Sequence, residues 1–313
     1  MTDTLPAPVR THPPVTAVVP THNRPEMMKR AVQSIVDQTY PGPIEILVVF
    51  DACEPVLPEI ELPPNRTLTA LVNDRIRGLA GGRNTGILAA TTEFVAFLDD
   101  DDYWFPEKLD VQMELFSQRP EALLVGTAMV VDDGERMHER LVPSDLVQHR
   151  DLLKKKFAGL HSSSFVFRRT PLIEQLGMID EDLPRAYGED WDILLRTSAI
   201  TDVPVVNRPL VGVTWQGQSY YFGKWGPYAE ALQYLLAKHE DLSSDRRNLG
   251  HIQSQIAFAL AASGQRREAR EWAGKAIRND FRQPKAHLAL AISLRLITAD
   301  RVARIVQRFG KGI

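Results

Sequence analysis

The feature that most constrains the fold is a regular alternation of apolar runs and helical patterns over residues 15–131. Amphipathic spacing predicts helices that begin near Pro25, Gly82 and Pro106. The apolar runs between them predict buried strands at 15–20, 44–49, 67–72, 93–98 and 123–131. Near-continuous apolar strands that alternate with helices are typical of a parallel sheet covered on both faces. We therefore predict an α/β fold with a mostly parallel central sheet.

The remainder of the chain changes character twice. Residues 132–158 are charged and irregular, which predicts a mobile loop over a site, and from residue 228 onward the texture is helical. Further elements are expected as strands at 162–167 and 203–213 and as helices at 188–196, 248–263, 265–278 and 284–296. The small residues of the last three helices resemble a tetratricopeptide hairpin with part of a second. We divide the chain into a flexible tail (1–14), an α/β domain (15–227) and a helical C-terminal region (228–313).

Composition excludes several classes of protein. The single cysteine, Cys53, rules out an intramolecular disulfide and hence a disulfide-framed secreted domain. The net charge of −3 gives no reason to expect a nucleic-acid partner. We see neither the apolar core of a signal peptide nor a membrane-spanning run, so we expect a cytoplasmic protein. The charge is uneven, however. From Asp245 onward there are 14 Lys and Arg against 5 Asp and Glu, whereas the preceding residues hold 23 against 35.

Polar clusters follow three of the predicted strands. They are Thr21–Arg24, Asp51 and the acidic run Asp99–Asp102. In parallel sheets ligands bind outside the carboxyl ends of the strands, where these clusters would meet. Four adjacent carboxylates repel one another, and a divalent cation, Mn²⁺ or Mg²⁺, would offset that repulsion and bridge to substrate phosphates. The alternative is a solvated acidic loop or a helix cap.

Five short motifs stand in one order along the chain. They are VVPTHNR (18–24), VVFD (48–51), GGRNTG (81–86), FLDDDDYWFP (97–106) and GEDW (188–191). In this order they resemble family 2 of the inverting glycosyltransferases, over roughly residues 15–215. The resemblance implies a GT-A fold that binds a nucleotide-sugar donor.

The resemblance also implies donor-site roles for particular residues. Asp51 matches the aspartate that recognises the nucleobase, typically uracil. Asp101 is the expected direct metal ligand. The other residues expected at the donor site are Thr21, Arg24, Arg83, Asp99 and Asp100, with Asp99 facing ribose or metal-bound water. Two departures stand out: the family usually has Asp-Asp or Asp-Asn where this chain has Phe50-Asp51, and Trp215-Gln216 occupies the place of a family histidine.

On the acceptor side, Asp190 matches the catalytic base of the family. An incoming hydroxyl needs a proton acceptor, and the first turn of a helix favours an ionised carboxylate. Helix capping by Glu189 and Asp190 is the alternative. The weaker acceptor-site candidates are His161, Glu189, Trp191 and Trp215. For His161 the alternative is a structural histidine, and for Trp191 it is core packing. Trp215 belongs to an aromatic-rich loop that suits the faces of sugars.

The segment from Leu294 to Ile313 has the pattern of a basic amphipathic helix. It is compatible with peripheral contact to an anionic membrane. The alternative is a terminal helix that docks its apolar face on the preceding hairpin.

Together these features predict a metal-dependent inverting glycosyltransferase. We expect a UDP-sugar donor and a hydroxyl acceptor on a glycan, a lipid-linked sugar or a small natural product. A nucleotidyltransferase would share the sheet and the metal, but it favours a Gly- and Lys-rich phosphate loop that residues 21–25 lack. A non-catalytic nucleotide-binding or scaffold protein would not need Asp51, Asp101 and Asp190 together.

Overall fold

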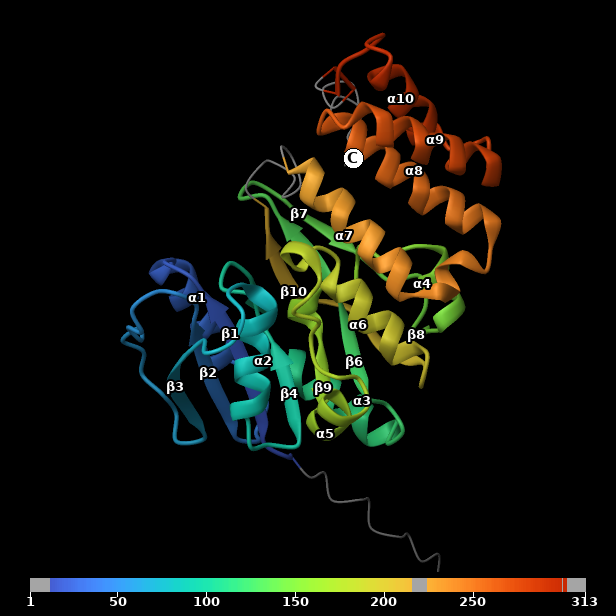
Figure 1. Ribbon diagram of the computed structural model, residues 1–313. Helices are drawn as coiled ribbons and strands as arrows, with labels where there is room; N and C mark the ends of the chain where they lie inside the picture. The colour runs from blue at the N-terminus through green and yellow to red at the C-terminus, as the bar shows by residue number, and fades with distance from the viewer. Residues whose placement is uncertain (1–11, 216–223, 300, 303–313) are drawn as a thin grey trace, which may run out of the picture.

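The computed structural model describes residues 12–215, 224–299 and 301–302. One sheet forms its centre, with strand order β3-β2-β1-β4-β9-β6-β10-β5, while β7 pairs with β6 and β8 with β10 (Figure 1). The strands are β1 (Val15–Thr21), β2 (Ile44–Phe50), β3 (Arg66–Val72), β4 (Phe94–Phe97), β5 (Tyr103–Trp104), β6 (Leu124–Asp132), β7 (Met137–Arg140), β8 (Leu146–Val147), β9 (Val166–Arg168) and β10 (Val203–Thr214). Strand β1 pairs in parallel with β2 and β4, and β2 with β3, which confirms the predicted parallel core.

Helices cover both faces of this sheet (Figure 1). They are α1 (Pro25–Val36), α2 (Leu79–Ala89), α3 (Lys108–Gln118), α4 (His149–Lys154), α5 (Arg169–Glu174), α6 (Glu189–Ser198), α7 (Trp225–Lys238), α8 (Arg246–Ala262), α9 (Arg266–Asn279) and α10 (Pro284–Ser293). Short 3₁₀ turns η1 (Ser162–Ser164), η2 (Pro184–Ala186) and η3 (Glu240–Ser243) complete the chain.

The side chains of β1 alternate between two hydrophobic clusters. Val15, Ala17 and Val19 pack with α1 and α3, whereas Val18 packs with α2 and α6. Gly86 shows how closely α2 approaches the sheet, because a Cβ there would lie 2.3 Å from Cγ1 of Val18. The last glycine of the GGRNTG motif therefore lets α2 pack directly on β1.

Two predicted elements differ from the structure. Residues 132–158 were expected to form an irregular mobile loop, but they carry β7, β8 and α4. The expected strand at 162–167 is instead the turn η1 followed by the short strand β9, which runs antiparallel to β4 and β6. In η1 the serine residues bond locally, for example Ser164 Oγ to the carbonyl of His161 at 2.7 Å, in place of strand pairing.

The C-terminal helices pack on the α6 side of the sheet. The boundary predicted at residue 228 falls within α7, whose Ala229, Leu232 and Leu235 belong to the same hydrophobic cluster as α6. Ala259, Ala269, Ala273, Ala276 and Ala289 are buried where α8, α9 and α10 pack together. The helices thus lie at the predicted positions, while the tetratricopeptide resemblance stays a prediction.

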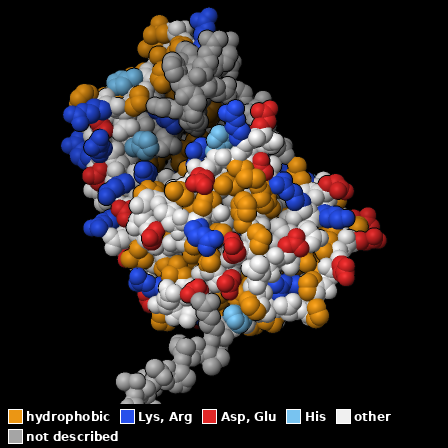
Figure 2. Space-filling view, turned by 180° about the vertical axis from the view of Figure 1, so that it is seen from behind, with side chains coloured by type: hydrophobic (Ala, Val, Ile, Leu, Met, Phe, Trp, Pro, Cys, Tyr) orange, Lys and Arg blue, Asp and Glu red, His pale blue; other side chains and the backbone are white. Residues whose placement is uncertain are grey.

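The basic excess of the C-terminal region is visible on the surface. Lys and Arg side chains gather along the left edge of Figure 2, where the C-terminal helices lie. The predicted amphipathic helix over 294–313 lies largely outside the described residues; within them Leu294 and Leu296 are exposed. Of the tail, residues 1–11 also lie outside the described residues, and Pro13 accepts a 2.6 Å hydrogen bond from the hydroxyl of Tyr40. In the described part of the chain, every helix is too short or too polar to cross a membrane.

Candidate functional site

The polar clusters after β1, β2 and β4 meet at one edge of the sheet. The register pairs Thr21 with Phe50, so Asp51 follows directly beside the end of β1. The hydroxyl of Thr21 donates to Oδ2 of Asp100 at 2.8 Å. Arg24 Nη1 lies 3.1 Å from Oδ1 of Asp100 and 3.0 Å from Oδ2 of Asp101. The predicted convergence of these residues is therefore present.

The acidic run carries more negative charge than its neighbours balance. Burial, together with the charges of Asp99 and Asp100, raises the pKa of Asp101 to about 6. Burial also raises the pKa of Asp102 well above its usual value, and the charges of Asp99 and Asp101 add to the shift. A bound cation would stabilise carboxyl groups whose pKa is raised in this way, because a nearby positive charge favours their ionised form.

One group of potential metal ligands stands out among the described residues. Asp99, Asp102 and His161 each place one donor atom so that these atoms lie within 4.8 Å of one another. Asp102 is held by Ser163, whose hydroxyl donates to Oδ2 at 2.6 Å, and by the Thr214 amide at 3.2 Å. The sequence reasoning gave Asp102 no role, although it is the fourth member of the acidic run.

Arg83 links the acidic run to α6. Its guanidinium is fully buried and pairs with Oδ1 of Asp99 and Oε1 of Glu189, while Nη2 donates to Ser162 Oγ at 2.9 Å. Glu189 Oε2 has no hydrogen-bond partner in the described structure. The side chain predicted to lie near the nucleotide is therefore engaged by two carboxylates, and through them it connects two of the sequence motifs.

Asp190 lies in the first turn of α6 and is largely buried. Gly188, with φ of 87°, takes the left-handed conformation that turns the chain into this helix. Lys156 Nζ lies 2.6 Å from Oδ2 of Asp190. Burial would raise the pKa of Asp190, but the charge and hydrogen bond of Lys156 hold it below its usual range. Sequence reasoning missed Lys156, whose only signal is a run of three lysines in the charged segment.

Asp51 uses both carboxylate oxygens within the structure. Asn73 Nδ2 donates to Oδ1 at 2.7 Å, and the amide of Gly78 donates to Oδ2 at 3.0 Å. Asn73 was not singled out from the sequence. Its signal is its position, because Asn73 directly follows β3 just as Asp51 directly follows β2. The carboxylate is thereby fixed at the strand ends with acceptor lone pairs remaining.

The acceptor-site candidates have different environments. The side chain of His161 is 28% exposed. Its partial desolvation lowers its pKa, and the negative charges of Asp99 and Asp190 oppose that shift without cancelling it. Trp191 is buried, and its indole N–H donates to the Leu152 carbonyl at 3.0 Å. Trp215 is exposed at the end of the described segment, and Gln216 lies outside the described residues.

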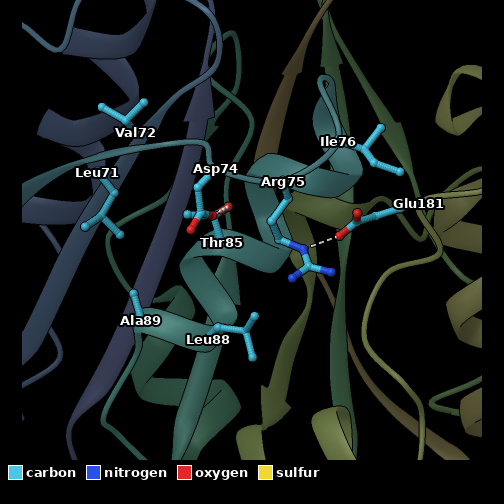
Figure 3. Close-up of a pocket in the computed structure, with 9 residues that line it drawn as sticks. All are labelled: Leu71, Val72, Asp74, Arg75, Ile76, Thr85, Leu88, Ala89 and Glu181. Carbon is cyan, nitrogen blue, oxygen red and sulfur yellow. Dashed lines mark hydrogen bonds and ion pairs between the residues drawn. The ribbon is translucent and has the colours of Figure 1, made fainter.

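A pocket of about 540 Å³ lies beside α2 (Figure 3), and Asn73, the partner of Asp51, hydrogen-bonds Ile76 and Thr85 in its wall. None of the nine residues that line it is one of the predicted site residues. Arg75 in its wall is paired with Glu181, and Leu71, Val72 and Leu88 supply apolar surface (Figure 3). The chemistry-bearing groups gather at the strand ends instead, so we place the candidate site there.

Comparisons with known proteins agree with this architecture. A beta-1,3-glucosyltransferase of Escherichia coli, WfgD, is 27% identical over 160 residues, which cover 50% of this chain and 61% of that protein. Its name gives UDP-Glc as donor and alpha-D-GlcNAc-diphosphoundecaprenol as acceptor. The chain thus spans less than two thirds of that relative.

Solved structures share the fold over nearly the whole chain. Staphylococcus aureus TarS (residues 1–349) in complex with UDP-GlcNAc superposes with a TM-score of 0.57 at 18% identity, covering 95% of this chain and 92% of that one. The mannosyltransferase PcManGT from Pyrobaculum calidifontis, in complex with GDP-Man and Mn²⁺, gives 0.54 at 20% identity, covering 98% and 87%. These likenesses confirm the predicted GT-A fold.

The family model for glycosyl transferase family 2 matches residues 16–176, more than half of the chain and including four of the five motifs. The fifth, GEDW, lies in α6 beyond the matched region, and Arg83 and Glu189 connect it to the acidic run. Sequence, fold and family model coincide: the chain belongs to glycosyl transferase family 2.

Proposed function

We propose that this chain transfers a sugar from a nucleoside diphosphate sugar, with UDP as the preferred nucleotide, to a hydroxyl of a lipid-linked sugar or glycan. The observation that carries the proposal is the Asp99–Arg83–Glu189 chain of ion pairs. It joins the acidic run, which suits a diphosphate and its metal, to the helix turn that holds Asp190.

The donor half of the proposal rests on the strand ends. Asp51 offers a fixed carboxylate acceptor, which suits a base with a ring N–H such as uracil. The names of the E. coli relative and of the TarS complex, which give UDP-Glc and UDP-GlcNAc, support a UDP-sugar. The PcManGT complex contains GDP-Man, whose guanine also has a ring N–H.

The residues present fit a divalent cation. Carboxylate oxygens are the ligands that Mg²⁺ and Mn²⁺ prefer. Burial, and after it the charges of neighbouring aspartates, raises the pKa of Asp101 and of Asp102, and a cation would offset both causes. Asp99 and Asp101 would hold the cation, with Asp102 and His161 adjacent. A bound cation would supply charge neutralisation for the departing diphosphate.

Asp190 is proposed as the general base. Its lowered pKa keeps it ionised at neutral pH, so it can accept the proton of the acceptor hydroxyl. In a single displacement the acceptor oxygen bonds to the anomeric carbon while the bond to the diphosphate breaks. The configuration at that carbon is inverted, and the proton ends on Asp190.

The acceptor class is supported by the diphosphoundecaprenol-linked sugar in the name of the E. coli relative. The test measures nucleoside diphosphate release from UDP-Glc, UDP-GlcNAc and GDP-Man, with GlcNAc-diphosphoundecaprenol as acceptor and with or without Mn²⁺. Asp190→Asn should lose about 10²–10⁴-fold in rate and keep donor binding. Asp241→Asn, at an exposed carboxylate, is the matched control. A wild-type rate in Asp190→Asn contradicts the assignment of the base.

A further inference from the structure

The carboxylate of Asp190, the proposed base, forms an ion pair with the ammonium group of Lys156. Lys156 Nζ lies 2.6 Å from Oδ2 and 2.8 Å from Oδ1 of Asp190, and the Trp191 amide donates to Oδ1 at 2.8 Å. A carboxylate stabilised in this way is a weak proton acceptor, because protonation would break its ion pair. An acceptor hydroxyl can use Asp190 fully only after the ammonium has moved.

Lys156 is placed so that it can move. It follows the end of α4, in a stretch without helix or strand, and 37% of its side chain is exposed although Asp190 is nearly buried. Phe157 and Leu160 are buried and anchor the chain directly after it. The backbone is thus held while the long, flexible side chain reaches from solvent to the base.

The surroundings of Lys156 carry more basic charge than their acidic partners neutralise. Lys154, Lys155 and Lys156 are consecutive and exposed. Lys154 lies 3.6 Å from Asp151, and Lys155 lies over the ring of Phe157. The acidic run at the strand ends is opposite in sign and suits the donor diphosphate through a metal.

We propose that Lys156 recognises a phosphate or diphosphate ester carried by the acceptor, and that this anion draws the ammonium away from Asp190. The inference rests on the proposed function, since it requires Asp190 to be the base. A phosphate ester carries up to two negative charges and several acceptor oxygens, so it competes well with one carboxylate for an ammonium. The acceptor hydroxyl then gives its proton to Asp190, and Lys156 stays protonated throughout. Base release is thereby coupled to binding of an anionic acceptor.

The first test measures binding by calorimetry, with the chain saturated with UDP and with equal free Mn²⁺ in cell and syringe. The probes are decyl diphosphate, inorganic pyrophosphate and the neutral decyl glucoside. We expect Lys156→Gln to weaken decyl diphosphate binding about tenfold or more and Lys156→Arg to retain it. Lys275→Gln, at an exposed lysine that lies over Trp272 in α9, is the matched control and should bind as the wild type does.

The outcomes separate the sources of the anion. Weakened binding of both decyl diphosphate and pyrophosphate supports recognition of the phosphate group itself. Weakened binding of decyl diphosphate alone supports recognition of the lipid-linked form. Equal binding by wild type and Lys156→Gln, or no binding of either anion by the wild type, overturns the proposal.

The second test reports the release of the base. Hydrolysis of UDP-Glc or UDP-GlcNAc with water as acceptor is followed against pH. In Lys156→Gln the acid limb should lie at higher pH than in the wild type, because Asp190 has lost its ammonium partner, while His161, the other charged group that acts on Asp190, is the same in both proteins. An unmoved limb contradicts the coupling. Absence of UDP binding and of hydrolysis in the wild type would instead contradict the proposed function itself.

Discussion

Asp192 Oδ1 lies 2.7 Å from Nε2 of His239, and this contact joins the helix of the proposed base to the end of α7. Lys238 Nζ is 2.8 Å from the same oxygen and 2.5 Å from Oδ2 of Asp180. Arg196 Nη2 lies 2.5 Å from the other oxygen of Asp192. The first helix of the C-terminal region thus braces the turn that presents Asp190, two residues before Asp192.

Asp192→Asn should destabilise the chain at neutral pH. Burial would raise the pKa of Asp192, but His239, Arg196 and Lys238 lower it far below its usual value. A depressed carboxyl pKa gives stability that is present above the unfolded pKa, about 4, and is lost as the pH falls toward the folded pKa. We expect a loss of about 3 kcal/mol at pH 7, since the variant removes the buried carboxylate that His239, Arg196 and Lys238 share.

Urea unfolding at pH 7, 4.5 and 3.5 checks this prediction. The difference between wild type and Asp192→Asn should shrink below about pH 4, where the unfolded carboxyl is protonated. Asp241→Asn, at an exposed partner of His149, should show little difference at any of these pH values. A gap that stays constant with pH would exclude the ionised carboxylate as its cause.

Gly188→Ala should lower the stability of the chain more than Gly264→Ala does. Gly188 and Gly264 both have φ of 87°, which costs an alanine about 1–2 kcal/mol. A Cβ at Gly188 would also lie 3.0 Å from Cδ1 of the buried Leu235, whereas one at Gly264 meets open space. Thermal unfolding of the two variants compares the strain alone with the strain plus the contact. Equal losses of stability in the two variants would show that Leu235 of α7 moves away from the added Cβ at no energetic cost.

The ends of the buried parallel strands could be read closely from the sequence. Strands β1 and β2 each end only one residue past the predicted end. The prediction is this close because an uninterrupted apolar run marks a strand with both faces covered. The segment 162–167 misled for a physical reason. Its serines bond to nearby carbonyls and form a turn, and a residue pattern does not reveal that choice.

The site divides in the same way. The meeting of Thr21, Asp51 and Asp100 follows from parallel strand order, which the sequence indicates. The contact of Lys156 with Asp190 spans 34 residues and depends on how α4 packs against α6. Such a contact is set by tertiary packing, and no local periodicity reports it.

Asp51→Asn should weaken binding of UDP and leave binding of pyrophosphate unchanged. The carboxylate is held by Asn73 and Gly78, and it would accept from the ring N–H of the base. A hydrogen bond to a charged group contributes about 1.5–3 kcal/mol, so the affinity for UDP should fall at least about tenfold. Calorimetry with both ligands measures this. Asn73→Ala keeps the carboxylate and the Gly78 contact that holds it, so it should give a smaller loss of UDP binding. An equal loss of pyrophosphate binding would indicate a collapsed site.

Asp101→Asn should abolish the effect of Mn²⁺ on nucleotide binding. In the wild type, UDP and Mn²⁺ together should raise the stability of the chain, by about 2.7 kcal/mol when the ligand is at one hundred times its Kd. Asp101 is partly exposed beside Arg24, so its replacement leaves the buried Asp102 and its serine contact in place. Thermal shifts with UDP, with and without Mn²⁺, test the variant against Asp110→Asn, which changes a partly buried carboxylate in the first turn of α3, away from the acidic run in sequence. If Asp101→Asn still responds to Mn²⁺ as the wild type does, the cation is held by Asp99, Asp102 and His161, whose donor atoms already lie together.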